Sequence, residues 1–280
     1  MSKTSDGGWS TTVTQTDESV LPGQSPAPGA GLLVRGVGVS FSGVIALRNV
    51  SMSVRRGEVL GLIGPNGAGK TTFFDVVSGL RPPENGTIFF DGNDITGHSA
   101  VARSRAGIRR TFQRQQVFGR LTVEENLLTA TEWHGGGGGI LADLVAFPPR
   151  KRIERRRREA VNEVLQMCGL EPYRHTMAGS LPIGTARMVE LGRALAESPS
   201  LLLLDEPTSG LGGAEVEHLS EVIRRLKGEL SCSILLVEHD ITFVMSHSDR
   251  IVVLQLGEVL AEGTPTEIQA NPEVRNAYLG

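Results

Sequence analysis

The sequence has few of the features that mark membrane-spanning, disulfide-rich or nucleic-acid-binding proteins. Only two of its 280 residues are cysteines, Cys168 and Cys232, and their separation fits no metal-binding spacing. No run approaches the roughly 20 apolar residues of a transmembrane helix; the strongest are the four-residue runs 201–204 and 234–237. The net charge of −3 provides no overall positive field for nucleic acid. These absences favour a chain in a reducing compartment that does not span a bilayer.

The first 30 residues also lack the apolar centre of a secretion signal. They are rich in Ser, Thr, Gly and Pro, a composition that buries too little apolar surface to fold, so we expect residues 1–30 to form a disordered tail. With 39% apolar and 21% charged residues, the chain is able to bury a sizeable core, as one large domain or as two small lobes.

Beyond residue 31, short apolar runs alternate with helical patterns. The runs 59–63, 201–204, 234–237 and 251–254 are apolar at every position except for one glycine. Strands of a parallel sheet look like this when helices cover both faces of the sheet. The pattern therefore predicts an α/β fold.

The segment between Gln113 and Leu201 has a different pattern. It contains five consecutive glycines at 135–139, and after them a basic stretch followed by apolar residues near 161, 164, 165 and 168. This spacing places the apolar residues on one face of a helix. We expect a mostly helical lobe, at about 114–198, inserted into the α/β body.

The stretch GPNGAGKTT follows the strand at 59–63 and opens a helix, in the order that the phosphate-binding pattern G-x-x-x-x-G-K-[ST] requires. Its glycines allow successive backbone N–H groups to point at an anion, and the helix adds its positive end. Lys70 is expected to reach the terminal phosphates and Thr71 to ligate magnesium. The expected phosphate-binding residues are Gly64, Pro65, Asn66, Gly67, Ala68, Gly69, Lys70, Thr71 and Thr72. The alternative is a glycine-rich turn without a ligand.

Two further buried strands end in acidic or basic side chains. LLLLDEP delivers Asp205 and Glu206 at the edge where open α/β sheets bind ligands. Asp205 suits magnesium, and Glu206 suits the orientation or deprotonation of an attacking water. ILLVEHD places His239 at the same edge. The alternatives are a solvated acidic pair before a turn and an ordinary histidine satisfied at the surface or in the core.

Taken in order, these pieces resemble the ATP-binding cassette (ABC) ATPases over about residues 32–280. The resemblance rests on Phe41, GPNGAGKTT, TFQ (111–113), LPIGT (181–185), LLLLDEP, SGLG (209–212) and EHD (238–240). It implies a P-loop NTPase core with a mixed sheet, an N-terminal antiparallel β part and an inserted helical subdomain, the cassette spanning 31–280. It also implies ATP and Mg²⁺ as cofactors. In that family, residues in the positions of Phe41, Gln113 and His239 respectively stack on adenine, sense magnesium beside the membrane partner, and contact the γ-phosphate.

The finer resemblance is to ATPase subunits of branched-chain amino-acid importers. It is carried by residues 109–128, by the long insertion before 180, and by 249–280 with its AYLG ending. This implies membrane permeases and a second cassette as partners, an extracytoplasmic binding protein acting indirectly, and a place on the cytoplasmic face of the cell membrane. The cassette of a lipid or lipopolysaccharide exporter is an alternative. A soluble cassette acting on nucleic acid is another, but those usually have two cassettes or coiled-coil arms, so no nucleic-acid partner is expected.

The LPIGT segment departs from the family sequence LSGGQ, which closes over the ATP of the partner subunit. Pro182, Ile183 and Thr185 replace Ser, Gly and Gln, while Leu181 and Gly184 remain. Loss of the Ser hydroxyl removes a hydrogen bond to phosphate of about 1.5–3 kcal/mol. The helix dipole remains, so we interpret the segment as a modified cap on the partner's ATP.

Two other stretches leave questions open. The family usually has Asp where Gly212 stands, a change at the same dimer face, and the sequence does not distinguish a homodimer from a heterodimer. The run 150–158 has seven basic residues in nine. It fits a solvated helical face, aided by a Glu154–Arg158 pair. The alternatives are contact with anionic lipid headgroups and, last, with nucleic acid.

Overall fold

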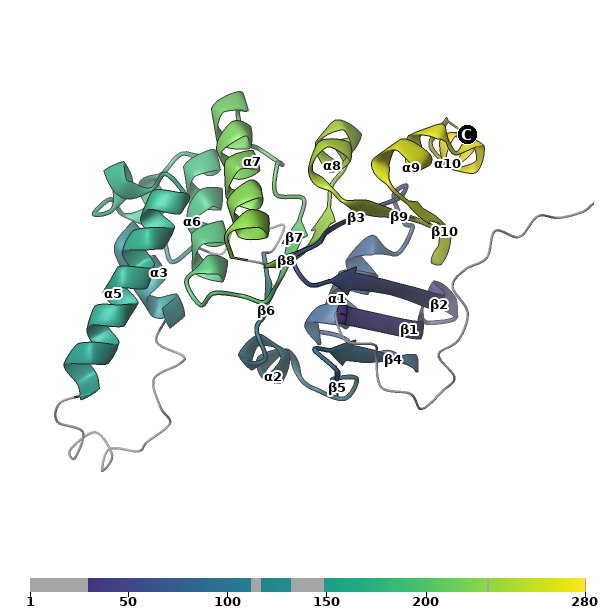
Figure 1. Cartoon of the computed structure of the whole chain (residues 1–280), viewed down its shortest axis with the longest axis horizontal. Helices are drawn as coiled ribbons and strands as arrows, with labels where there is room; N and C mark the ends of the chain where they lie inside the picture. The colour runs from purple at the N-terminus through teal and green to yellow at the C-terminus, as the bar shows by residue number, and fades with distance from the viewer. Residues whose placement is uncertain (1–29, 112–116, 132–148, 231, 280) are drawn as a thin grey trace, which may run out of the picture.

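The structure is a computed structural model that describes residues 30–111, 117–131, 149–230 and 232–279. Three stretches considered above lie outside these ranges: residues 1–29 of the expected tail, the glycine run at 135–139, and Gln113. The first strand, β1, begins at Ala30 (Ala30–Phe41). The described part of the chain forms two sheets with helices around them (Figure 1).

The first sheet is antiparallel and is built mainly from the N-terminal part of the chain. It contains β1, β2 (Val44–Arg55), β4 (Asn85–Phe90) and β5 (Asn93–Asp94), in the order β2-β1-β4-β5. Ser42 and Gly43 join β1 to β2 and both have positive φ, of 48° and 88°. Two such residues in a hairpin turn match the right-handed twist of the strands that it connects. This sheet confirms the expected antiparallel β part.

The second sheet contains β3 (Val59–Ile63), β6 (Ile108–Arg110), β7 (Leu201–Asp205), β8 (Ser233–Val237), β9 (Arg250–Gln255) and β10 (Glu258–Gly263). Its order is β10-β9-β3-β8-β7-β6, with parallel pairing throughout except between β9 and β10. All residues of β3, β7 and β8 are buried. The predicted α/β class and mixed sheet are therefore confirmed, because the apolar runs form its central strands.

The helices fall into groups that Figure 1 separates. α3 (Val123–Thr131), α5 (Pro149–Met167) and α6 (Ile183–Leu195) lie together at one end of the molecule, with α7 (Gly213–Gly228) beside them. α1 (Lys70–Ser78), α2 (Ala100–Arg105) and α8 (Ile241–His247) flank the sheets, and α9 (Pro265–Ala270) and α10 (Pro272–Leu279) close the chain. Two short 3-10 turns, Glu171–Tyr173 and Ala178–Ser180, precede α6. Within the ranges given above, no helix is long and apolar enough to cross a membrane.

The basic run lies on α5, whose second half is anchored and whose first half projects (Figure 1). Val161 and Leu165 are buried in the core. Arg158 pairs with Glu154 at 2.7 Å, as expected, with both side chains more than 60% exposed. Such pairs stabilise a helix by only about 0.3–0.5 kcal/mol. The described arginines of the run thus lie on a largely solvated helical face.

The second sheet separates two apolar clusters. Leu60 and Leu62 contribute to one, together with α1, whereas Val59 and Ile63 contribute to the other. The second cluster also takes in residues of α3, α5 and α6, so the sheet and those helices share one core. Both cysteines are buried and unpaired, and burial raises the pKa of each thiol to about 12. They pack in the interior, as their spacing predicted.

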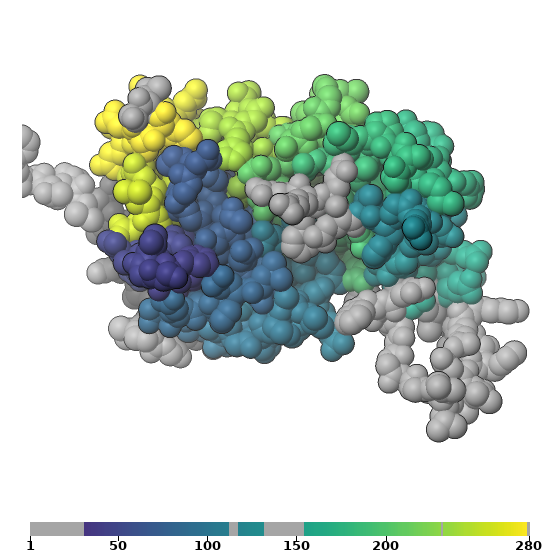
Figure 2. Space-filling model, turned by 180° about the vertical axis from the view of Figure 1, so that it is seen from behind, coloured from purple at the N-terminus to yellow at the C-terminus, as the bar shows by residue number. Residues whose placement is uncertain are grey.

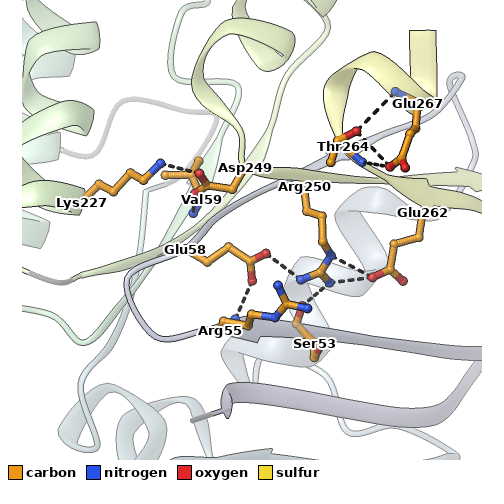
Figure 3. A network of polar contacts seen from close by, with 10 residues as sticks. All are labelled: Ser53, Arg55, Glu58, Val59, Lys227, Asp249, Arg250, Glu262, Thr264 and Glu267. Atoms are coloured by element: carbon orange, nitrogen blue, oxygen red, sulfur yellow. Dashed lines mark hydrogen bonds and ion pairs between the residues drawn. The ribbon is translucent and has the colours of Figure 1, made fainter. Parts of the chain in front are cut away.

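A polar network fixes the amino end of β3 (Figure 3). Arg250, the first residue of β9, contacts Glu58 at 2.6 Å and Glu262 at 2.6 Å, and it also donates to Ser53 O. The carboxylate of Asp249 accepts from the backbone N–H of Val59 at 2.9 Å. Glu58 is 7% exposed, so its ion pair is well shielded from solvent. The network ties β2, β3, β9 and β10 together at the end of β3 opposite the candidate site.

Candidate active site

The phosphate-binding pattern lies in a tight loop between β3 and α1. Gly69 has φ 103°, and a Cβ there would lie 2.6 Å from the carbonyl oxygen of Ala46, so only glycine fits. The Lys70 ammonium lies within the loop and donates to the carbonyl oxygens of Gly64 at 2.6 Å and Pro65 at 3.0 Å. Burial lowers the pKa of Lys70, an effect that the carboxylates of Glu206 and Asp205 oppose.

A pocket of about 200 Å³ opens over this loop. Its lining consists of Ala46, Asn66, Gly67, Ala68, Gly69, Lys70, Thr71, Thr72 and His239. α1 begins at this pocket, and no acidic residue lies in its first turn to compete for an anion. A Cβ on Gly67 would meet no atom within 4 Å, so the absent side chain leaves the opening clear. The pocket therefore fits a phosphate chain.

Residues near the C-terminus contact the phosphate-binding loop through hydrogen bonds to its backbone. Figure 2 shows them in yellow against the blue segment that contains the loop. The backbone N–H of Gly257, in the turn between β9 and β10, donates to Ala68 O at 3.0 Å. Burial raises the pKa of Tyr278 to about 12, and a hydrogen bond with the Gly64 backbone works against that increase. The end of the chain thus contributes to the shape of the phosphate-binding loop.

Asp205, the last residue of β7, is a buried carboxylate, and only one of its two oxygens has a described hydrogen-bond partner. Its Oδ2 accepts from Arg110 Nη2 at 2.9 Å, whereas Oδ1 is buried and has no hydrogen-bond partner among the described residues. Burial raises the pKa of Asp205, and the Arg110 hydrogen bond opposes that increase. A buried carboxylate oxygen of this kind fits a hard divalent cation. Asp205 is therefore suited to hold Mg²⁺, and Thr71, which lines the pocket, offers a hydroxyl oxygen as a second ligand.

Glu206 and His239 meet at the ends of the adjacent strands β7 and β8. The His239 Nε2 lies 2.8 Å from Glu206 Oε1. Glu206 has φ 49°, a left-handed conformation that costs a non-glycine residue about 1–3 kcal/mol. Its backbone N–H donates to Val237 O at 2.8 Å, which holds the strained residue in place. Non-glycine residues in such conformations cluster at active sites.

Glu238 supports both of these residues, a role that the sequence analysis did not predict. Its side chain is buried, and it accepts hydrogen bonds from the backbone N–H groups of Thr208 at 2.6 Å and His239 at 3.1 Å. It therefore fixes the turn after Glu206 relative to the segment that carries His239. The sequence does contain a clue to this role, because Glu238 is an acidic residue directly after the buried strand β8.

Two of the expected site residues are not among the described lining of the pocket. Gln113 lies outside the described residues. Phe41, at the end of β1, is not among the lining residues of the pocket, and the guanidinium of Arg81 lies 4.1 Å from the centre of its ring.

LPIGT forms the start of α6, away from the phosphate-binding pocket. Leu181 lies just before the helix, Pro182 is its N-cap, and Ile183 is 64% exposed. Gly184 and Thr185 follow in the first turn. The start of α6 thus presents an exposed apolar side chain and has no side-chain cap, as suits contact with another molecule.

A carboxylate from α7 occupies the space beside two glycines, Gly184 of LPIGT and Gly212 of SGLG. A Cβ on Gly184 would lie 2.8 Å from Glu215 Oε1, and a Cβ on Gly212 would lie 2.7 Å from Oε2. The glycine at 212, where the family usually has Asp, therefore leaves room for the Glu215 side chain. The substitution is visible in the sequence, but the Glu215 side chain that it accommodates is not.

Comparison with known proteins agrees with this geometry. Residues 47–209 match the family model described as ABC transporter, and residues 258–280 match the one described as branched-chain amino acid ATP-binding cassette transporter. The high-affinity branched-chain amino acid transport ATP-binding protein BraF of Pseudomonas aeruginosa is 40% identical over 249 residues, which cover 89% of this chain and 97% of that protein. LivG of Escherichia coli, which has the same description, is 38% identical over the same lengths.

Solved structures give the same result. The ADP conformation of MJ1267, an ATP-binding cassette of an ABC transporter, has a TM-score of 0.75 at 30% identity, over 90% of this chain and 99% of that one. The dimeric structure of MJ0796, a bacterial ABC transporter cassette, has a TM-score of 0.70 at 25% identity, over 84% and 98%. The chain belongs to the ABC transporter family and is an ATP-binding, ATP-hydrolysing cassette of that family.

Proposed function

We propose that this cassette powers the import of branched-chain amino acids or related small polar solutes. The relatives BraF and LivG are named for branched-chain amino acid transport, and the C-terminal family model has the same description. In this proposal residues 31–280 form the cassette, with a helical subdomain at about 114–198 and a tail at 1–30. The observation that carries the ATPase assignment is the convergence of Lys70, Asp205, Glu206 and His239 at one sheet edge.

Each residue of the site has a distinct part in the proposed hydrolysis. Lys70 and the start of α1 hold the phosphates, and Thr71 and Asp205 hold Mg²⁺, which when bound neutralises charge on the phosphate oxygens. Glu206 orients a water molecule and accepts a proton from it as the water oxygen attacks the γ-phosphorus; the bond between the β- and γ-phosphates breaks, and ADP and inorganic phosphate are the products. His239 fixes the Glu206 carboxylate through the 2.8 Å contact and faces the terminal phosphate. Gln113 is assigned to magnesium sensing by resemblance alone.

We place a permease segment in a groove beside the edge strand β6. The groove has a volume of about 310 Å³ and is lined by Ser78, Leu80, Ala100, Val101, Ser104, Ile108, Arg109, Arg110 and Glu197. Leu80 and Val101 are 54% and 50% exposed, although both are apolar. Apolar side chains at the rim of a groove favour a protein partner. The groove lies where the chain leads toward Gln113, the residue expected to face the permease.

In the assembled transporter this chain would pair with a second cassette, identical or different, on the cytoplasmic face of the membrane. LPIGT and SGLG would then face the nucleotide of the partner. ATP binding would draw the two cassettes together, and hydrolysis would release them. An extracytoplasmic binding protein would deliver the solute. The alternative, a cassette of a lipid or lipopolysaccharide exporter, would have a similar catalytic domain but would assemble with different proteins.

The test is to purify the tagged chain from membranes and identify the proteins that accompany it. Two permeases, a second cassette and a solute-binding protein, together with ATP-dependent uptake of labelled leucine by the reconstituted complex, are expected. Recovery of lipopolysaccharide-handling or ribosomal proteins instead would overturn import as the function. ATP hydrolysis by the purified chain, measured separately, tests the enzymatic assignment.

A further inference from the structure

The segment that follows α1 packs against the end of β1. Glu84 donates its backbone N–H to Gly38 O at 2.9 Å. Its carboxylate accepts from the backbone N–H of Ser40 at 3.0 Å and from the Ser40 hydroxyl at 2.8 Å. Ser40 directly precedes Phe41, so these contacts fix the backbone from which the Phe41 side chain projects.

Arg81, in the same segment, covers one face of the Phe41 ring. Its guanidinium carbon lies 4.1 Å from the ring centre, which is well within the range of a cation–π contact. The backbone N–H of Arg81 donates to Asp75 O at 3.1 Å, which ties the residue to α1. Phe41 remains 40% exposed. One ring face is therefore occupied, and the exposed part of the ring is available to a ligand.

We propose that Arg81 and Glu84 are positioning residues that hold Phe41 as a fixed platform for the nucleotide base. The inference rests on the proposed function, in which the loop at Lys70 binds the phosphates, and on the family resemblance, by which Phe41 stacks on adenine. Arg81 covers one face of the Phe41 ring, so the base is left with the other face. Glu84 holds the backbone at Ser40 and thereby fixes the orientation of the ring toward the base.

The helix α1 links this platform to the phosphate site. Its first residue is Lys70, and the Arg81–Glu84 segment follows shortly after its last residue, Ser78. Nine helical residues span about 13 Å at 1.5 Å per residue. Base and phosphates would thus rest on parts attached to the two ends of one short, rigid element. Binding would then require little ordering of the ring, and this removes one of the free-energy costs of association.

The experiment measures the Kd of Mg-ATP and of Mg-tripolyphosphate, which has no base, with the full-length protein by calorimetry. Arg81→Gln and Glu84→Ala are expected to weaken ATP binding by roughly three- to tenfold, the size of one lost ordering or cation–π contribution. Both variants should bind tripolyphosphate as the wild type does. Arg81→Lys, which keeps the charge but not the planar contact, is expected to lie between the wild type and Arg81→Gln.

The chain offers a matched control in Arg35, whose guanidinium lies 5.6 Å from the centre of the Phe89 ring on the same sheet. Arg35→Gln should leave both Kd values unchanged. A double-mutant cycle supplies the second readout, because Arg81→Gln should have no further effect once Phe41 is replaced by Ala. Melting temperatures of all variants verify that each is folded.

Several results would overturn the inference while leaving the proposed function intact. One is unchanged ATP affinity in folded Arg81→Gln and Glu84→Ala. Another is an equal loss of ATP and tripolyphosphate affinity, which would indicate damage to the phosphate loop. A third is additivity of Arg81→Gln with Phe41→Ala. If the wild-type protein bound neither ligand, the proposed function itself would fail.

Discussion

Arg110 Nη2 lies 2.9 Å from Asp205 Oδ2, and Arg110 Nη1 lies 2.6 Å from Asp75 Oδ1. The Arg110 side chain is only 8% exposed, and it also lines the groove proposed for the permease. One guanidinium thus touches both the carboxylate suited to Mg²⁺ and the surface suited to a membrane partner. A displacement of Arg110 by the permease would alter the charge balance at Asp205.

Arg110→Gln should destabilise the protein when no metal is present. The substitution leaves Asp205 buried without its cation, and breaking a buried pair in this way costs about 3–5 kcal/mol. Mg-nucleotide should restore part of the loss, because the metal supplies positive charge at the same carboxylate. Differential scanning calorimetry with and without Mg-ATP measures this. The control is Arg48→Gln, since Arg48 and Glu258 are both more than half exposed and their pair contributes little. Equal shifts in the two variants would contradict the assignment.

Asp205→Asn should have the opposite effect on stability. Burial raises the pKa of Asp205, so the ionised form is less favourable in the folded chain than in the unfolded one. The stabilisation linked to this carboxyl is fully present below its unfolded pKa and is lost as pH rises through the folded value. Arg110 keeps its ion pair with Asp75 in this variant, so it is not left as an unpaired buried charge. At pH 7 without metal, Asp205→Asn should therefore melt no lower than the wild type, and the pH dependence above pH 4 should flatten. It should also lose the stabilisation by Mg-ATP. A lower melting temperature at pH 7 would argue against this account.

Glu206→Gln should abolish turnover while leaving ATP binding intact. Removing a general base costs typically 10²–10⁴-fold in rate, and the amide keeps the size of the side chain near His239. The trapped ATP-bound dimer should appear in light scattering after size exclusion, with a released-phosphate assay as the measure of turnover. Glu217→Gln on the exposed face of α7 is the control for loss of one carboxylate. Normal phosphate release by Glu206→Gln would show that the base has been misassigned.

Gly212→Asp restores the residue that the family usually has, but it should not increase the free energy of unfolding. The new Cβ would lie 2.7 Å from Glu215 Oε2, so the Glu215 side chain has to move, and the added carboxylate repels it. Because Gly212 is exposed and is the N-cap of α7, where Asp is itself a favourable cap, we expect a net loss of no more than about 0.5 kcal/mol in unfolding free energy. Replacing Glu215 by Ala in the same chain should turn this loss into a small gain, because the repulsion is removed while the Asp cap remains. Urea denaturation of the two single variants and the double variant gives the coupling, and simple additivity would exclude the contact.

Much of the fold follows from short-range pattern. The runs at 59–63, 201–204, 234–237 and 251–254 are apolar on both faces because the strands that they form are buried between helices, so sequence alone identifies them. The phosphate-binding loop can be recognised from the sequence as well, since the positive φ angles at Gly67 and Gly69 favour glycine at both positions.

The contacts that the sequence analysis missed join residues far apart in the chain. Arg110 and Asp205 are separated by 95 positions, and Phe41 and Arg81 belong to different elements of the fold. Nothing in either local sequence specifies such a partner, because the pairing depends on how the sheets and helices are placed. The position of Glu215 is equally hidden in the sequence, since its carboxylate lies beside Gly184 and Gly212 only because the starts of α6 and α7 come together.

The single apolar cluster that runs from β7 into α3, α5 and α6 bears on how the protein unfolds. Leu202 and Leu204 pack in the same cluster as Leu127 and Leu165, so neither the sheet nor the helical part has a complete core without the other. Heating should therefore melt the two parts cooperatively, in one calorimetric peak. A cavity made in a helix by Leu165→Ala should lower the thermal tolerance of the distant ATP-binding loop as much as that of the helix itself.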